Sequence, residues 1–264
     1  MVDASVASDF QRGARRLLAA ATAAAWLAAS PASAKEEPPA LPRPDAPATD
    51  LSTPLHLATP QPDGPPEFTS VTFASVALTA AGFVTAFVVH EACHGVANLA
   101  MANIPTLEPV TFLGVLPFFA VSPDIGCSNG TCVKRDGSPF VPGPKGYAFI
   151  VSSGILCQEI TDEIILTGNP RIRYETAPFL KGMLFFNTAT SVAYGIASLI
   201  RIEPPEGDLA GLDTLHGLPH GVFAALVLGT AALDIARYFL PGVGWLPWVS
   251  RGSKVLTVGL VVAF

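Results

Sequence analysis

Charged residues are scarce in this sequence. Asp, Glu, Lys and Arg make up 14% of the 264 residues, whereas a typical soluble domain has about a quarter. Half of the residues are hydrophobic, and the mean hydropathy is positive. This balance argues against a soluble domain and indicates a chain that crosses a membrane several times.

Clustered basic residues are also missing. The formal net charge is -6, and Lys and Arg form no block or stripe along the chain. Proteins that bind nucleic acids usually carry such a patch to contact phosphates. We therefore expect no nucleic-acid partner.

The first 34 residues have the pattern of a bacterial secretory signal peptide. Three arginines between positions 12 and 16 precede the apolar run 17–29, and residues 32–34 form an A-x-A cleavage pattern. The apolar run is too short to span a bilayer well, which disfavours an uncleaved anchor. Both interpretations place residue 35 outside the cytoplasm. The expected location is a bacterial inner membrane, with the following segment in the periplasm.

Residues 35–67 are rich in Pro, Ala, Asp and Thr and have almost no large apolar residues. Such a composition cannot bury a core and favours an extended chain. We expect a disordered extracytoplasmic tether here, followed by a membrane-embedded domain over residues 68–264.

Several apolar segments follow the tether. The first helix candidate covers residues 68–101 and is uncharged up to Val89, and Asn103 and Pro105 end it. Further candidates cover residues 146–166, 179–200 and 221–240, and an apolar tail covers residues 253–264. The expected fold is an α-helical polytopic membrane protein with about 4–5 transmembrane helices.

Residues 110–121 are apolar but much shorter than the ~20 residues of a spanning helix. Gly114 and Pro117 disfavour a helix, and Val, Phe and Thr favour strands. We expect a re-entrant β-hairpin directly after the first helix. Non-helical backbone at membrane depth must be buried in protein or line a wet cavity.

The sequence His90-Glu91-Ala92-Cys93-His94 is an HExxH motif in the first helix candidate. Positions i and i+4 of a helix share a face, so both histidines can bind one zinc ion. Ionisable residues after a lipid-length apolar run indicate a functional cavity. Because the helix enters from outside, the motif should lie toward the cytoplasmic side. Glu91 is the expected general base, which accepts a proton from water and delivers it to the leaving amine.

A catalytic zinc site needs a third protein ligand, commonly His or a carboxylate. We favour Asp208, because it follows the third helix candidate at the depth of the motif. Asp213 is the near alternative. Asp234 and Glu159 are placed toward the outer leaflet, and Arg237, one turn from Asp234, is a suitable ion-pair partner for it.

The chain has four cysteines. Cys127 and Cys132 lie in the polar loop 122–145, which the expected topology places in the cytoplasm, so we predict free thiols there. Cys93 and Cys157 lie in helix candidates and are interpreted as buried small apolar residues.

These features resemble the site-2 protease family of membrane-embedded zinc metalloproteases. The resemblance covers residues 68–240 and rests on HExxH at 90–94, Gly95, the hairpin segment 110–121 and Ser152-Ser153-Gly154. It implies a zinc cofactor and a substrate that is a transmembrane segment of another protein, cut within or near the bilayer. In that family the third ligand is an Asp in a Leu-Asp-Gly context. This sequence has only Gly207-Asp208-Leu209 and Leu233-Asp234-Ile235 as partial matches.

The leading functional hypothesis is therefore an intramembrane zinc endopeptidase in contact with the lipid bilayer. The missing Leu-Asp-Gly leaves an inactive membrane scaffold derived from such an enzyme as the second hypothesis. A membrane protein that binds metal for transport or storage is the third.

Overall fold

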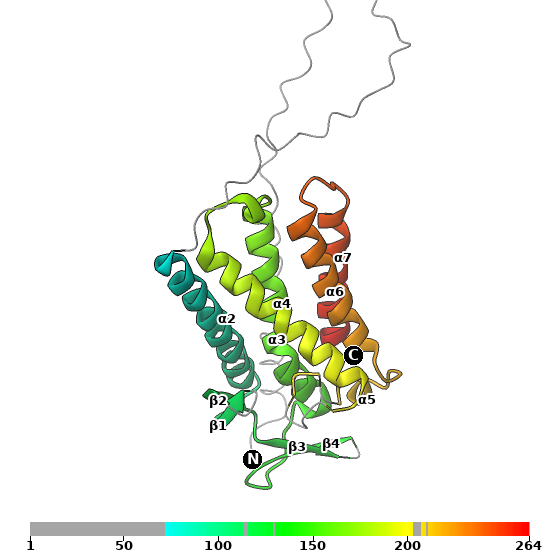
Figure 1. The fold of residues 1–264 in the computed structure, drawn as a ribbon. Coiled ribbons are helices and arrows are strands. Elements are labelled where there is room, and N and C mark those ends of the chain that lie inside the picture. Colours follow the sequence, from blue (N-terminus) through cyan, green and yellow to red (C-terminus); the bar gives the residue numbers. More distant parts are fainter. Residues whose placement is uncertain (1–71, 113–115, 129, 203–206, 210, 264) are drawn as a thin grey trace, which may run out of the picture.

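The structure is a computed structural model, and it describes residues 72–112, 116–128, 130–202, 207–209 and 211–263. The predicted signal peptide (1–34) and tether (35–67) lie outside the described residues. The described chain is mostly helical and contains two small hairpins (Figure 1). The helices are α2 (Phe73–Ala100), α3 (Gly143–Gly168), α4 (Pro178–Leu199), α5 (Leu212–Leu215), α6 (Val222–Phe239) and α7 (Leu246–Ala263), with a 3₁₀ turn at Ile172–Tyr174.

Two antiparallel hairpins follow α2. The first pairs β1 (Thr106–Phe112) with β2 (Leu116–Ser122), where the sequence predicted a hairpin, although it begins earlier than expected. The second pairs β3 (Ile125–Ser128) with β4 (Thr131–Lys134), within the segment expected to be a polar loop. Both hairpins and α5 lie at one end of the helical bundle, where α2 ends (Figure 1).

Local sequence fixes both ends of α2. Thr72 and Ser75 form a capping box at its start, each side chain accepting a hydrogen bond from the other residue's backbone N–H. At its end Ala102 adopts a left-handed conformation, and the backbone N–H of Asn103 donates to the carbonyl of Asn98. This 6→1 bond closes a Schellman motif. Helix α2 therefore ends at Ala100, shortly before Asn103, which the sequence had marked as its end.

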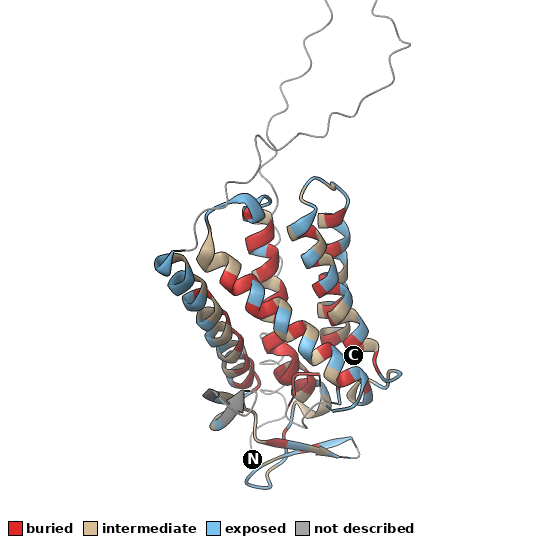
Figure 2. Cartoon of the chain, in the orientation of Figure 1, coloured by how far each residue is buried: buried red, intermediate tan, exposed pale blue. Residues whose placement is uncertain are grey.

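Two helices, α2 and α6, are long and apolar enough to cross a membrane by length and composition. Only 17% of the most apolar window of α2 is buried inside the protein, so most of this window is at least partly exposed. Figure 2 shows this exposed face along α2, in contrast to the buried face of α3. A soluble domain rarely exposes so continuous an apolar face.

Glycines allow α2 and α4 to pack closely. A β-carbon at Gly82 would overlap the backbone of Phe179, and one at Gly182 would overlap the backbone of Thr79. The two glycines thus let each helix approach the other's backbone, as small residues do in membrane helix pairs. The remaining helices pack in the order α4 on α6, α6 on α7, and α7 back on α3.

The cysteine predictions are wrong, because all four cysteines are paired. Cys127 and Cys132 face each other across β3 and β4 with a Cα–Cα distance of 4.1 Å. Cys93 on α2 is bonded to Cys157 on α3, with a Cα–Cα distance of 6.5 Å. The prediction of free thiols followed from the expected cytoplasmic placement of loop 122–145, and the two helical cysteines were interpreted as separate apolar residues.

Candidate metal centre

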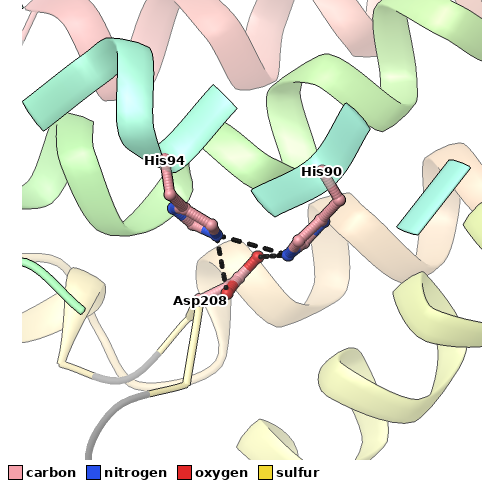
Figure 3. Close-up of side chains that lie close together, drawn as sticks. All are labelled: His90, His94 and Asp208. Atoms are coloured by element: carbon pink, nitrogen blue, oxygen red, sulfur yellow. Dashed lines mark hydrogen bonds and ion pairs between the residues drawn. The ribbon is translucent and has the colours of Figure 1, made fainter. Parts of the chain in front are cut away.

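The two histidines of the motif meet Asp208 at the point where α2 packs on α3. His90 and His94 lie on successive turns of α2, and Asp208 comes from the connection between α4 and α5. All three side chains are buried. In Figure 3 both imidazole rings point toward the carboxylate.

The ligand atoms of these residues converge. Nε2 of His90 lies 3.1 Å from Oδ2 of Asp208, and Nε2 of His94 lies 3.3 Å from Oδ1. The two Nε2 atoms are 3.2 Å apart. Together the three residues form a buried group that could hold a metal ion.

The donor set and its spacing fit a zinc ion. Two imidazoles and one carboxylate are a known catalytic zinc combination, and a tetrahedral site with bonds of about 2.0–2.1 Å separates its ligands by roughly 3.3 Å. The observed separations of 3.1 to 3.3 Å match this value. Oδ2 of Asp208 is buried and makes no well-formed hydrogen bond despite its proximity to His90. A bound cation would satisfy this oxygen.

Hydrogen bonds orient His94 for ligation. Its Nδ1 lies 2.9 Å from the carbonyl oxygen of Ile150 on α3 and 3.2 Å from Oγ of Ser153. Since the carbonyl only accepts, we assign the proton of His94 to Nδ1, which leaves the Nε2 lone pair for a metal. The turn of α3 that contains Ile150 and Ser153 thus holds the imidazole ring of His94 and selects its tautomer.

Gly154 on α3 makes room for both rings. A β-carbon at this position would lie 2.5 Å from Cε1 of His90 and 2.5 Å from Nε2 of His94. Real β-carbons do not approach other atoms so closely, so any side chain here would displace the imidazoles. The small-residue stretch 152–154, noted in the sequence, therefore has a steric role at the site.

Asp208 is held in place by its neighbour Leu209. Leu209 and Leu212 are buried in an apolar cluster with side chains of α3, α6 and α7. Burial alone would raise the pKa of Asp208, but its interactions with His90 and His94 outweigh burial and hold that pKa below its ordinary value. The carboxylate is therefore ionised and suited to bind a cation.

Glu91 is linked to the first hairpin. The backbone N–H of Val121 on β2 donates a 2.7 Å hydrogen bond to Oε2 of Glu91. Glu91 also interacts electrostatically with His90, His94 and Asp208. The expected general base is thus beside the three candidate ligands and is oriented by the hairpin.

The other candidate carboxylates have different contacts. Asp213 accepts hydrogen bonds from the backbone N–H groups of Gly221 (2.5 Å) and Phe223 (3.1 Å), and so caps the start of α6. Asp234 lies 3.7 Å from the guanidinium of Arg237, the ion pair that the sequence suggested. Glu159 is buried on α3 among further ionisable residues.

The sequence did not reveal every contributor to the site. Ile150 and Val121 act through backbone atoms, which leave no signal in residue type. The Cys93–Cys157 disulfide joins α2 to α3 beside His94, and only the spatial pairing of the helices shows it.

Comparisons with protein-family models, with curated proteins and with solved structures find no match to this chain.

Proposed function

We propose that this chain is an intramembrane zinc endopeptidase that hydrolyses peptide bonds in or near transmembrane segments of other membrane proteins. The observation that carries the proposal is the convergence of His90, His94 and Asp208 with Glu91 beside them. Two histidines from HExxH, one distant carboxylate and an adjacent glutamate are the parts that zinc-dependent peptide hydrolysis requires.

Each of these residues has a defined task in the proposed reaction. A bound zinc ion would supply Lewis-acid polarisation of the scissile carbonyl and a more acidic water molecule. Glu91 would accept a proton from the attacking water and deliver it to the departing amine. The hydrogen bond from Val121 holds one carboxylate oxygen of Glu91, which limits rotation of the side chain during proton transfer.

The membrane setting is also part of the proposal. Apolar side chains along α2 face outward, among them Val84, Val88 and Val96. We infer that α3, α4 and α7 lie in the bilayer beside α2 and α6, which gives the 4–5 spans expected from the sequence. The location would be a bacterial inner membrane, and the substrate would reach the site from within the lipid.

A glutamate substitution tests this function. The full chain, purified and reconstituted in vesicles, would be incubated with a set of single-span membrane proteins as probes, and cleavage would be followed by mass spectrometry. Glu91→Gln should abolish cleavage and keep the zinc content near one ion per chain, because Glu91 is not a ligand. Glu175→Gln is the matched control, since Glu175 is exposed outside the site, and it should leave cleavage unchanged.

Three results would contradict the proposal. Cleavage retained by Glu91→Gln would remove the glutamate from the chemistry. A wild-type protein that binds zinc but cleaves none of the probes would favour the inactive scaffold, and zinc flux into the vesicles would favour a metal carrier.

A further inference from the structure

A second group of ionisable side chains is buried away from the metal centre. It joins α3, α6 and α7 and contains four carboxylates and three cations, all of them buried. The acids are Glu159, Asp162, Glu163 and Asp234, and the cations are Arg237, Arg251 and Lys254. Charged side chains inside a membrane domain are costly and usually functional.

Glu163 is the best-paired acid of this group. It contacts Arg237 at 2.5 Å and Arg251 at 2.7 Å, and Lys254 lies 3.3 Å away. Asp234 is paired too, with Nζ of Lys254 at 2.9 Å and a hydrogen bond of 2.7 Å from Ser250. The three cations are therefore occupied by two of the four acids.

Asp162 and Glu159 are less well compensated. Oδ1 of Asp162 accepts a 2.7 Å hydrogen bond from the neutral amide of Asn187 on α4. Both carboxylate oxygens of Glu159 are buried without a well-formed hydrogen bond, although Thr230 is close enough to interact with them, and the side chain is only 4% exposed. Glu159 faces Asp162, Asp234 and Lys254, with which it interacts electrostatically.

The numbers of acidic and basic residues in this cluster indicate that it binds a proton. With four acids and three cations, full ionisation would leave one negative charge in a buried space, which is strongly unfavourable. We propose that this cluster is a proton-binding site in which Glu159 and Asp162 share one proton at neutral pH. Uptake of that proton makes the group electrically neutral and allows α6 and α7 to pack on α3.

This proposal is independent of the proposed peptidase. The metal ligands lie on α2 and in the α4–α5 connection, and none of the seven residues contributes to them. The cluster would bind its proton whether or not the chain cleaves peptides. Loss of the proton should instead weaken the packing of the last two helices.

Infrared spectroscopy of the full chain in detergent tests the site. A protonated carboxyl has a C=O stretching band that shifts on hydrogen–deuterium exchange, and an ionised carboxylate lacks it. At neutral pH the wild type should show the band of one protonated carboxyl. Glu159→Gln and Asp162→Asn should each lose it, because three acids then balance three cations. Glu175→Gln, which changes an exposed acid, should retain it.

The charge count makes a second, opposite prediction. Lys254→Met leaves four acids with two cations, so the band should roughly double in area. A wild-type spectrum without a protonated carboxyl would overturn the proposal, as would a band that survives in both Glu159→Gln and Asp162→Asn. A band present in choline buffer and absent in sodium buffer would also overturn it, because the resident ligand would then be a monovalent cation.

Discussion

Gly154 lies so close to His94 that a β-carbon on the glycine would sit 2.5 Å from the Nε2 atom of the histidine. The same β-carbon would meet the ring of His90. The geometry of the candidate metal centre therefore requires a residue without a side chain at position 154 of α3.

Gly154→Ala should weaken metal binding. The added methyl group displaces both imidazoles, and disturbing the surroundings of a ligand typically costs about 10–100-fold in metal affinity. Alanine is a better helix former than glycine by about 1 kcal/mol, so α3 itself should not be weakened by helix propensity. Zinc titration against a competing chelator measures the change.

Gly168→Ala provides the matched control. Gly168 ends the same helix, and a β-carbon there would meet nothing within 4 Å. Its zinc affinity should equal that of the wild type. Equal zinc affinity in Gly154→Ala would contradict the close packing of α3 on the two histidines.

The two acids of the α4–α5 region should respond differently to substitution. Asp208→Ala removes a ligand and should lower zinc affinity by more than the roughly 10–100-fold seen for outer partners. Asp213→Ala removes the cap of α6 and should lower the free energy of unfolding by about 1 kcal/mol, with zinc affinity kept. Zinc titration and detergent unfolding separate the two effects. Loss of zinc in Asp213→Ala alone would assign the third ligand to Asp213.

Much of this centre could be predicted from the sequence, because HExxH encodes its own geometry. A helix places His90 and His94 on one face, whatever surrounds it. Asp208 was preferred over Asp213 because its expected depth in the membrane matched that of the HExxH motif. Depth alone does not determine the direction in which a side chain points. The structure supplies that direction: the carboxylate of Asp208 lies 3.1 Å and 3.3 Å from the two histidines of α2, next to the buried Leu209.

Other features could not be predicted, because they depend on contacts between distant segments. The apolar tail was too short to count as a span, yet α7 begins at Leu246 and brings Arg251 and Lys254 to Glu163 on α3. A short apolar run with Gly114, Pro117 and many strand-favouring residues predicted the first hairpin. Each strand of the second hairpin has only four residues and is largely polar, so the sequence did not predict it.

The hydrogen bond from Val121 to Glu91 should matter for turnover and not for zinc binding. Val121→Pro removes the N–H donor, and a hydrogen bond to a charged group contributes about 1.5–3 kcal/mol, or roughly 10–100-fold in rate. Proline is tolerated where a strand's N–H points away from its ladder. Peptidase turnover should fall by this factor while zinc content stays unchanged. Val121→Ala keeps the N–H and should keep turnover; an equal loss in both variants would assign the effect to the side chain.

The cysteine pairs predict which side of the membrane the metal centre faces. The Cys127–Cys132 disulfide joins the two strands of the second hairpin, at the hairpin end of the bundle (Figure 1), and disulfides persist in oxidising compartments. This favours a periplasmic hairpin end, opposite to the orientation derived from the N-terminal signal pattern. In intact cells, a membrane-impermeant maleimide should label Cys127 and Cys132 only after an impermeant reductant is added.

An introduced thiol at the other end of the bundle completes this test. Arg171 is exposed in the connection between α3 and α4, at the end opposite the hairpins (Figure 1). Arg171→Cys should therefore react with the maleimide only in permeabilised cells. The opposite result has two parts: Arg171→Cys is labelled in intact cells, and the native cysteines react in permeabilised cells without reductant. This result would instead establish a cytoplasmic metal centre. In that case the disulfides could not persist in the cell, because the cytosol keeps thiols reduced.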